Sequence, residues 1–115
     1  MAVIYRQAGK LIEYTAGGNV ADHAPVAIGS LIGIARKSAV SGEKISCDAE
    51  GVFQFTKGSG ALTAGTPVTI TVATATAAAT AAGATSNGVV WADAASDDTV
   101  VDVKINQFIP VANQE

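Results

Sequence analysis

The sequence predicts an all-β fold, a small barrel or sandwich made of short strands. Apolar residues recur at every second position, as they do in strands, and helical periodicity is hard to find. Glycine-rich turns separate the alternating runs, a pattern typical of barrels and sandwiches. The chain has 115 residues, enough for a single modest core, so we expect one domain over residues 1–115.

Short strands and turns alternate along the first half of the chain. The predicted strands of this half cover residues 10–16, 25–29, 31–35 and 43–55. The first is followed by a glycine-rich turn at 17–19, and the next two lie on either side of a break at Gly29-Ser30. In the last, Ile45 and Cys47 share one face, and Gly51 interrupts the run. Cys47 is therefore expected to be a buried small hydrophobic residue.

The second half contains two clearly alternating runs. They cover residues 67–76 and 100–106. In the first, Val68 and Ile70 alternate with threonines, and the alternation continues into a stretch of Ala and Thr. We therefore expect one long strand over 68–76, a loose tip over 77–86 and a turn back at Asn87-Gly88.

The chain also repeats itself weakly. Pro25 corresponds to Pro67 at an offset of 42, and Gly33 corresponds to Gly88 at an offset of 55. The difference, 13, is the length of residues 73–85. This stretch therefore reads as an insertion into the second copy of a strand–turn–strand unit. Two such units are expected to pack as pseudo-symmetric halves of one small barrel.

Composition and charge exclude several classes of function. Charged residues make up 15% of the chain and hydrophobic residues 49%, which indicates a surface that is partly buried in an assembly. The net charge of −3 argues against a nucleic-acid partner. No apolar run approaches the length of a membrane span, and the start of the chain does not resemble a signal peptide. A single cysteine fits synthesis in a reducing cytoplasm.

The residues that support catalysis or metal binding are scarce. His23 is the only histidine and lies in a polar turn, where we expect it to be exposed. One Cys and one His do not make a zinc site, and no phosphate-binding loop motif is present. The acidic residues near the end of the chain lack the spacing of a calcium loop and are expected to form a solvent-facing turn; they are Asp93, Asp97, Asp98 and Asp102. We expect no enzyme activity, no cofactor and no metal. Trp91 fits either the core of the second repeat or an interface.

Several short motifs, taken in order, resemble the small capsid decoration, or cement, proteins of tailed bacteriophages. They are Tyr5, Gln7 and Gly9 at the start, the apolar run 33–35, the Gly-Glu turn 42–43 and the Gly-Val-Phe run 51–53. The resemblance covers nearly the whole chain. The family was formerly described only as a domain of unknown function, and some of its members carry a recombinase label. The missing phosphate-binding loop argues against that label for this chain.

The resemblance implies a barrel-like or tulip-like domain that binds the outer surface of an assembled phage head. It also implies a homotrimer that bridges subunits of the major capsid protein in the virion, after synthesis in the cytoplasm of a bacterial host. The alternative reading is a receptor-binding or carbohydrate-binding fibre module displayed on the same head. Neither reading involves nucleic acid or a membrane.

Two segments are predicted to contact other subunits. Residues 1–8 form an N-terminal arm without an obvious core partner, and we expect it to add to a strand edge of the capsid. The Ala/Thr-rich hairpin insertion, residues 73–86, has no charged side chain, so it can be buried against a neighbour without desolvating charge. The predicted contact residues are Val3, Ile4, Tyr5, Arg6, Ala75, Ala77 and Ala79.

Overall fold

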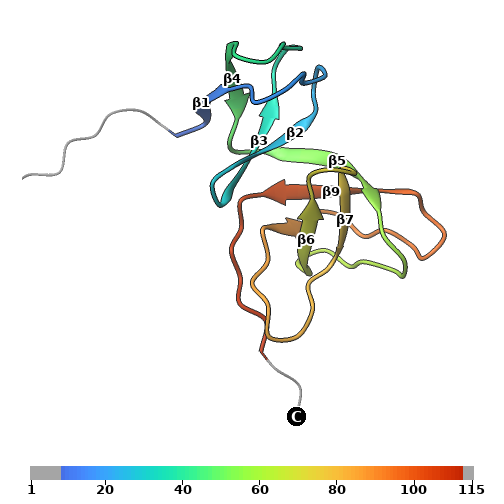
Figure 1. Cartoon of the computed structure of the whole chain (residues 1–115). Helices are drawn as coiled ribbons and strands as arrows, with labels where there is room; N and C mark the ends of the chain where they lie inside the picture. Colours follow the sequence, from blue (N-terminus) through green and yellow to red (C-terminus); the bar gives the residue numbers. More distant parts are fainter. Residues whose placement is uncertain (1–8, 113–115) are drawn as a thin grey trace, which may run out of the picture.

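The computed structural model describes residues 9–112, and within them it contains nine strands and no helix. The strands form two sheets, each made from a continuous part of the chain (Figure 1). The all-β, barrel-based prediction is therefore confirmed.

The first sheet is antiparallel and open. Its strands are β1 (Leu11–Thr15), β2 (Pro25–Ile28), β3 (Leu31–Ala35) and β4 (Lys44–Asp48). Their order across the sheet is β1-β4-β3-β2, so β1 and β2 are the two edges. The sheet curls into a half-barrel.

The second sheet closes into a barrel. Its strands are β5 (Val52–Lys57), β6 (Pro67–Thr71), β7 (Thr76–Ala79), β8 (Gly88–Val90) and β9 (Val100–Ile105). Their order is β5-β7-β6-β8-β9, and pairing between β9 and β5 completes the ring. Strand β7 lies between β5 and β6, parallel to the first and antiparallel to the second.

The register of the strands confirms the internal repeat, but the expectation that the two units form halves of one barrel was wrong, because each unit forms a sheet of its own. Strands β1, β2, β3 and β4 correspond to β5, β6, β8 and β9. Facing residues occupy equivalent places in the two sheets: Val26 and Gly33 correspond to Val68 and Gly88, and Ile12 and Cys47 correspond to Phe53 and Val103. The same correspondence relates two isolated bridges, Val20 with Ala39 and Leu62 with Ala94.

The turn before β2 repeats in the same way. The His23 N–H donates to the Ala35 carbonyl at 3.0 Å, and the Gly65 N–H donates to the Val90 carbonyl at 2.8 Å. Both donors have a positive φ, 63° for His23 and 91° for Gly65. His23 therefore occupies a backbone conformation that the second repeat gives to glycine.

The insertion supplies the strand that closes the barrel, and here the prediction of a long strand over 68–76 was wrong. The chain turns at residues 72–75 and returns as β7, so that Thr71 faces Thr76. Residues 76–79, expected to belong partly to a loose tip, are hydrogen-bonded on both sides. Asn87 and Gly88 do not form a turn, because Gly88 begins β8. The Ala/Thr alternation continues through the reversal, so it gave no sign of where the strand ended.

Two apolar clusters form the core, and β3 contributes to both. One side of β3 places Ile32 and Ile34 in the same core cluster as the buried side chains of the barrel. The other side places Ala35 in the cluster of the half-barrel, together with Ile45 and Cys47. Cys47 is fully buried, as predicted. A strand buried on both faces thus joins the two sheets.

Candidate functional site

The groups that sequence reasoning weighed for catalysis lie apart. The His23 side chain is 77% exposed, as expected, and its Nδ1 atom lies 3.0 Å from a carboxylate oxygen of Asp22. Cys47 is buried in the half-barrel, where burial and the nearby Asp48 raise the pKa of its thiol. An ordinary thiol pKa lies near 8.5, so at neutral pH this side chain is a protonated, packed group.

The acidic loop stabilises turns. Asp93 accepts a hydrogen bond from the Ala64 N–H at 2.7 Å, and Asp98 accepts one from the Ala95 N–H at 2.8 Å. Both side chains belong to exposed residues, in agreement with the predicted solvent-facing turn. Within residues 9–112, no three His, Cys, Asp or Glu side chains are grouped so that they could hold a metal ion. The same residues contain no helix of the length and hydropathy that a membrane crossing requires.

The one buried lysine serves the loops around the barrel. The Lys57 ammonium donates to the carbonyls of Gly58 at 2.9 Å, Gly60 at 2.6 Å and Ser96 at 3.3 Å. It therefore joins the loop after β5 to the loop before β9. Across the described part of the chain, every buried side-chain nitrogen and oxygen has a hydrogen-bond partner. Buried polar groups thus hold the fold together and none points unpaired into a cavity.

Among the described residues, β1 and β2 are the two edges of the first sheet, and we call the open side between them the seam. The Ala35 N–H donates to the Ala24 carbonyl at 2.9 Å, so in this antiparallel ladder the backbone of Pro25 and Ala27 faces away from β3. On the other edge, the Ala16 N–H donates to the Glu43 carbonyl at 2.8 Å, so the backbone of Thr15 faces away from β4. The outward-facing backbone groups of Ala27 and Thr15 are of the kind that an added strand can bond.

Side chains at the seam are less covered than their counterparts in the barrel. Phe55 and Ile70 are each 4% exposed, because β7 closes the barrel beside them. Tyr14 and Ile28 occupy the equivalent places in the first sheet and are only half-buried. Within residues 9–112, no strand of the first sheet takes the place that β7 has in the barrel, and these apolar side chains stay partly uncovered.

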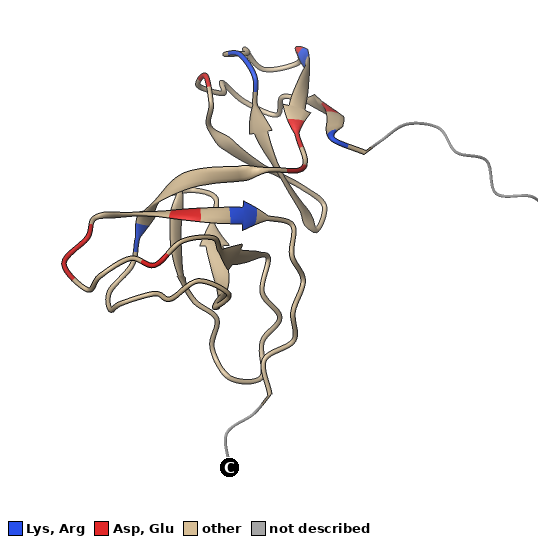
Figure 2. Cartoon of the chain, turned by 180° about the vertical axis from the view of Figure 1, so that it is seen from behind, with Lys and Arg blue, Asp and Glu red and all other residues tan. Residues whose placement is uncertain are grey.

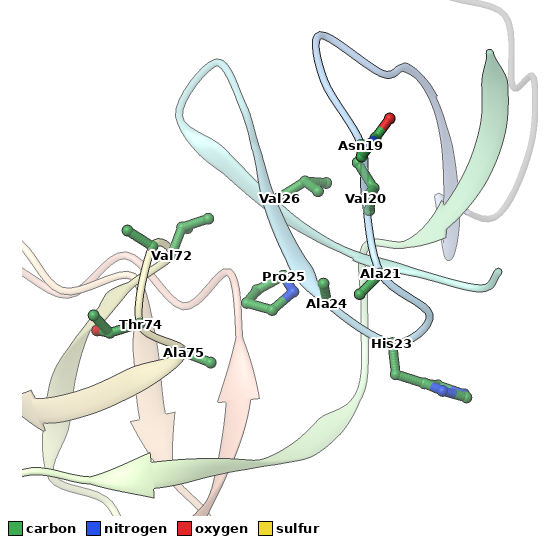
Figure 3. Close-up of a pocket in the computed structure, with 11 residues that line it drawn as sticks. Asn19, Val20, Ala21, His23, Ala24, Pro25, Val26, Val72, Thr74 and Ala75 are labelled. Carbon is green, nitrogen blue, oxygen red and sulfur yellow. The ribbon is translucent and has the colours of Figure 1, made fainter. Parts of the chain in front are cut away.

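A hollow of about 510 Å³ lies beside β2 at this side of the molecule. Pro25 and Val26 line one wall, and the turn at residues 72–75 lines the other. Figure 3 shows Pro25 facing Val72 and Ala75 across the hollow, whereas the His23 ring points away from it. Small and apolar side chains dominate its walls, which suits contact with a polypeptide better than with a charged ligand.

The structure separates the three alanines predicted as interface residues. Ala77 is fully buried inside the barrel, so its side chain packs against the protein's own core and cannot face a neighbour. Ala79 is exposed, and Ala75 is half-buried with φ 53°. The other predicted contacts, Val3, Ile4, Tyr5 and Arg6, lie outside the described residues 9–112.

Exposed apolar side chains are the feature that sequence reasoning missed or left open. Trp91 is 59% exposed, so it belongs to the surface of the protein and not to the core of the second repeat. Further large apolar residues with exposed fractions of 38–58% are Leu11, Val40, Val52, Val100, Phe108 and Ile109. Figure 2 shows charged residues on the first sheet and its loops, at the end of β5, on β9 and on the acidic loop, with the barrel around β6 and β8 free of charge. No charged residue occurs from Gly58 to Ala92.

Comparison with known proteins places these features in a family. The model of a family described as phage cement protein matches residues 6–105, which is most of the chain. A search of curated proteins found no match. The uncharged part of the barrel, residues 58–92, and the exposed apolar side chains suit a protein that packs against other proteins. The chain belongs to the phage cement protein family.

Proposed function

We propose that the protein decorates the outer surface of an assembled phage head as a homotrimer and stabilises the head by bridging major capsid subunits. Membership of the cement family supports association with the capsid and a structural, non-enzymatic role. The proposed sequence of events is synthesis in the cytoplasm of the bacterial host followed by docking on the completed shell.

The observation that carries this proposal is the uncharged part of the barrel, residues 58–92. From Gly58 to Ala92 the chain has no charged side chain, yet this span includes exposed positions such as Ala79. Surfaces of this kind can be buried without desolvating ions. The proposed contacts are Ala79, Ala75 and the arm residues Val3 to Arg6.

The stabilising mechanism is mass action. A protein that binds the assembled shell and not its separated subunits lowers the free energy of the shell, in proportion to the logarithm of its concentration relative to its dissociation constant. Many copies add their contributions. The proposal thus needs no reaction chemistry from the bound protein.

The test is co-sedimentation of the purified protein with undecorated heads, followed by heating of the decorated heads. The proposed function predicts saturable binding and a higher disruption temperature of the head. Ala79→Lys should weaken binding at least tenfold, because it places a charge in the contact. Ala95→Lys, on the exposed acidic loop, is the matched control and should bind like the parent. Failure of the parent protein to bind heads overturns the proposal.

A second candidate is a receptor-binding or carbohydrate-binding module displayed on the head. The observation that favours it is the 59% exposure of Trp91, because sugar sites commonly present an exposed aromatic ring. Binding to a glycan array that is lost in Trp91→Ala would support this function. Head binding without any glycan signal would support the cement function alone.

A further inference from the structure

We propose that a basic hollow on the first sheet of one copy faces an acidic hollow on the barrel of a second copy, and that ion pairs between the two hollows join the copies. The contact rests on the homo-oligomer of the proposed function and names the two surfaces that form it. It adds a charged contact between copies to the uncharged contact with the capsid.

The basic hollow, of about 390 Å³, lies where β3 ends and β4 begins. Its charged lining consists of Arg36, Lys37 and Lys44, with Ser46 beside them. The Arg36 N–H donates to the Ser46 carbonyl at 3.4 Å, so the chain after β3 stays beside β4 and keeps the three cations around one hollow. All three are exposed, and within residues 9–112 none of them forms an ion pair.

The acidic hollow, of about 130 Å³, is lined by three carboxylates, those of Asp93, Asp98 and Asp102. Asp97 lies in the adjoining turn, residues 95–98. Asp93 and Asp98 each accept a hydrogen bond from a backbone N–H. The exposed side chains of Asp97 and Asp102 have no hydrogen bond or ion pair in the described part of the chain, so they are free to bind cations of a neighbour.

The two hollows occupy equivalent places in the two repeats. The bond from the Arg36 N–H to the Ser46 carbonyl corresponds to a bond of 2.8 Å from the Trp91 N–H to the Asp102 carbonyl. Ser46 and Asp102 each line their hollow. One backbone arrangement therefore carries cations in the first repeat and carboxylates in the second, so the fold itself requires neither set of charges.

Opposite charge makes the hollows partners for each other. Cations gathered around one hollow repel one another, and the carboxylates of the other hollow do the same. Contact between the hollows relieves both repulsions and forms charge-assisted hydrogen bonds from Lys and Arg to free carboxylates. Such surfaces also steer two copies toward one orientation.

A single copy does not pair these charges internally. The basic hollow belongs to the first sheet and the acidic hollow to the barrel, and Figure 2 shows the cations of the first sheet and the acidic loop on different parts of the molecule. Since each copy offers one hollow of each kind, the contact is head-to-tail. In the proposed trimer it closes into a ring.

The acidic turn is held in place before it meets a neighbour. The Asp98 N–H donates to the Ala95 carbonyl at 3.0 Å, and the Asp98 carboxylate accepts from the Ala95 N–H at 2.8 Å. The Lys57 ammonium donates to the Ser96 carbonyl at 3.3 Å. The turn that carries Asp97 therefore has little freedom to lose when it binds.

A carbodiimide cross-link tests the pairing directly, because it joins a carboxylate to a lysine amine only where the two touch. Isotopically light and heavy protein are mixed and cross-linked in concentrated solution and on decorated heads. Peptides that join Lys37 or Lys44 to Asp97 or Asp102 should include mixed light–heavy pairs, which arise only between copies. Absence of every such mixed pair, in solution and on heads, overturns the inference.

Charge reversal tests the contact without a cross-linker. The basic-reversed chain carries Arg36→Glu with Lys44→Glu, and the acidic-reversed chain carries Asp97→Lys with Asp102→Lys. Each should melt close to the parent, because the side chains are exposed, and each should self-associate at least tenfold more weakly.

The chain with all four changes keeps the parent's net charge and restores opposite charges across the contact. It should therefore self-associate like the parent, a recovery that a merely structural role of these residues would not give. Unchanged self-association of both reversed chains, or no recovery in the chain with all four changes, overturns the inference.

A single reversal elsewhere is the matched control. Glu50 is exposed and lines neither hollow, so Glu50→Lys should self-associate like the parent, whereas Asp97→Lys should not. Ala95→Lys leaves Asp97 and Asp102 in place and so remains the control for head binding.

Head binding separates this contact from the proposed function. The capsid contact uses the uncharged part of the barrel, so the reversed chains should still co-sediment with heads. If they form the native oligomer and bind heads as the parent does, the charged contact is wrong and the cement function stands. If the parent binds no heads but gives the mixed cross-link in solution, the cement function fails and the charged contact stands.

Discussion

The side-chain amide of Asn106 brackets the backbone of Ile32, 74 residues away in the sequence. Its oxygen accepts from the Ile32 N–H at 2.7 Å, and its nitrogen donates to the Ile32 carbonyl at 2.8 Å. The nitrogen also donates to the Ala49 carbonyl at 2.8 Å. Asn106 follows β9 of the barrel, while Ile32 lies in β3 of the first sheet, so one side chain joins the two sheets.

Two replacements of Asn106 should distinguish the stability that its hydrogen bonds contribute from the stability that depends on its backbone conformation. Its φ of 60° is one that Asn and Gly tolerate better than Ala. Asn106→Gly loses only the amide, and we expect a loss of about 2–3 kcal/mol in the free energy of unfolding, measured in urea. Asn106→Ala should lose about 1 kcal/mol more. Stability of Asn106→Gly within about 0.5 kcal/mol of the parent would show that the bracket does not stabilise the fold.

Gly88 should tolerate no side chain. A Cβ there would lie 2.7 Å from the Val103 Cγ1 atom and 3.1 Å from the Ile70 Cδ1 atom. We expect Gly88→Ala to lower the free energy of unfolding by about 1–3 kcal/mol, because the core must shift. Val103→Ala in the same chain removes the closer contact. The double variant should therefore lose less stability than the sum of the losses in the two single variants. Gly18→Ala, which meets no atom within 4 Å, is the control.

His23→Gly should stabilise the protein. His23 holds a φ of 63° at the place where the second repeat has Gly65, and its side chain is 77% exposed. The strain that glycine removes at this left-handed position is larger than the entropy cost of its added flexibility in the unfolded chain. We therefore expect the free energy of unfolding, measured by thermal unfolding, to rise by about 0.5–1 kcal/mol. Asp22→Asn, which changes the exposed contact between the Asp22 carboxylate and the His23 ring, should alter stability by less than about 0.5 kcal/mol. A loss of stability in His23→Gly would contradict the argument.

Cys47 should make stability depend on pH in the alkaline range. Burial, and then the Asp48 carboxylate, raise the pKa of this thiol in the folded protein. The unfolded chain ionises first, near pH 8.5, so the contribution of the protonated thiol is complete below that pH and declines as the pH rises toward the folded pKa. Cys47→Ala should cost about 1 kcal/mol at pH 7, and this difference from the parent should shrink by pH 10. A stability difference between the parent and Cys47→Ala that stays constant from pH 7 to pH 10 would contradict the raised pKa of Cys47.

The strands and the repeat could be predicted from the sequence because both leave a local signal. Alternation at Val68 and Ile70, and the spacing of Pro25 and Pro67, depend only on neighbouring residues. Strand β7 was missed because the reversal at residues 72–75 uses no Gly, Pro or Asn, and Ala75 adopts a positive φ without a sequence marker.

The candidate site was harder to predict than the fold. The seam exists because β7 has no counterpart among the described strands of the first sheet, and only the pairing of both sheets shows this. The burial of Ala77 and the exposure of Trp91 likewise depend on which side of the barrel each residue faces. The bracket formed by Asn106 joins residues far apart in the sequence, so no local pattern announces it.

The position of β3 has a mechanical consequence for the proposed function, in which the protein holds a shell together under tension. Its Ile32 and Ile34 side chains are inserted in the barrel core, while its backbone belongs to the first sheet. A force that pulls the two sheets apart must withdraw both isoleucines and break the Asn106 bonds in one step. We therefore expect a single rupture event under tension, and not a gradual peeling of one sheet from the other.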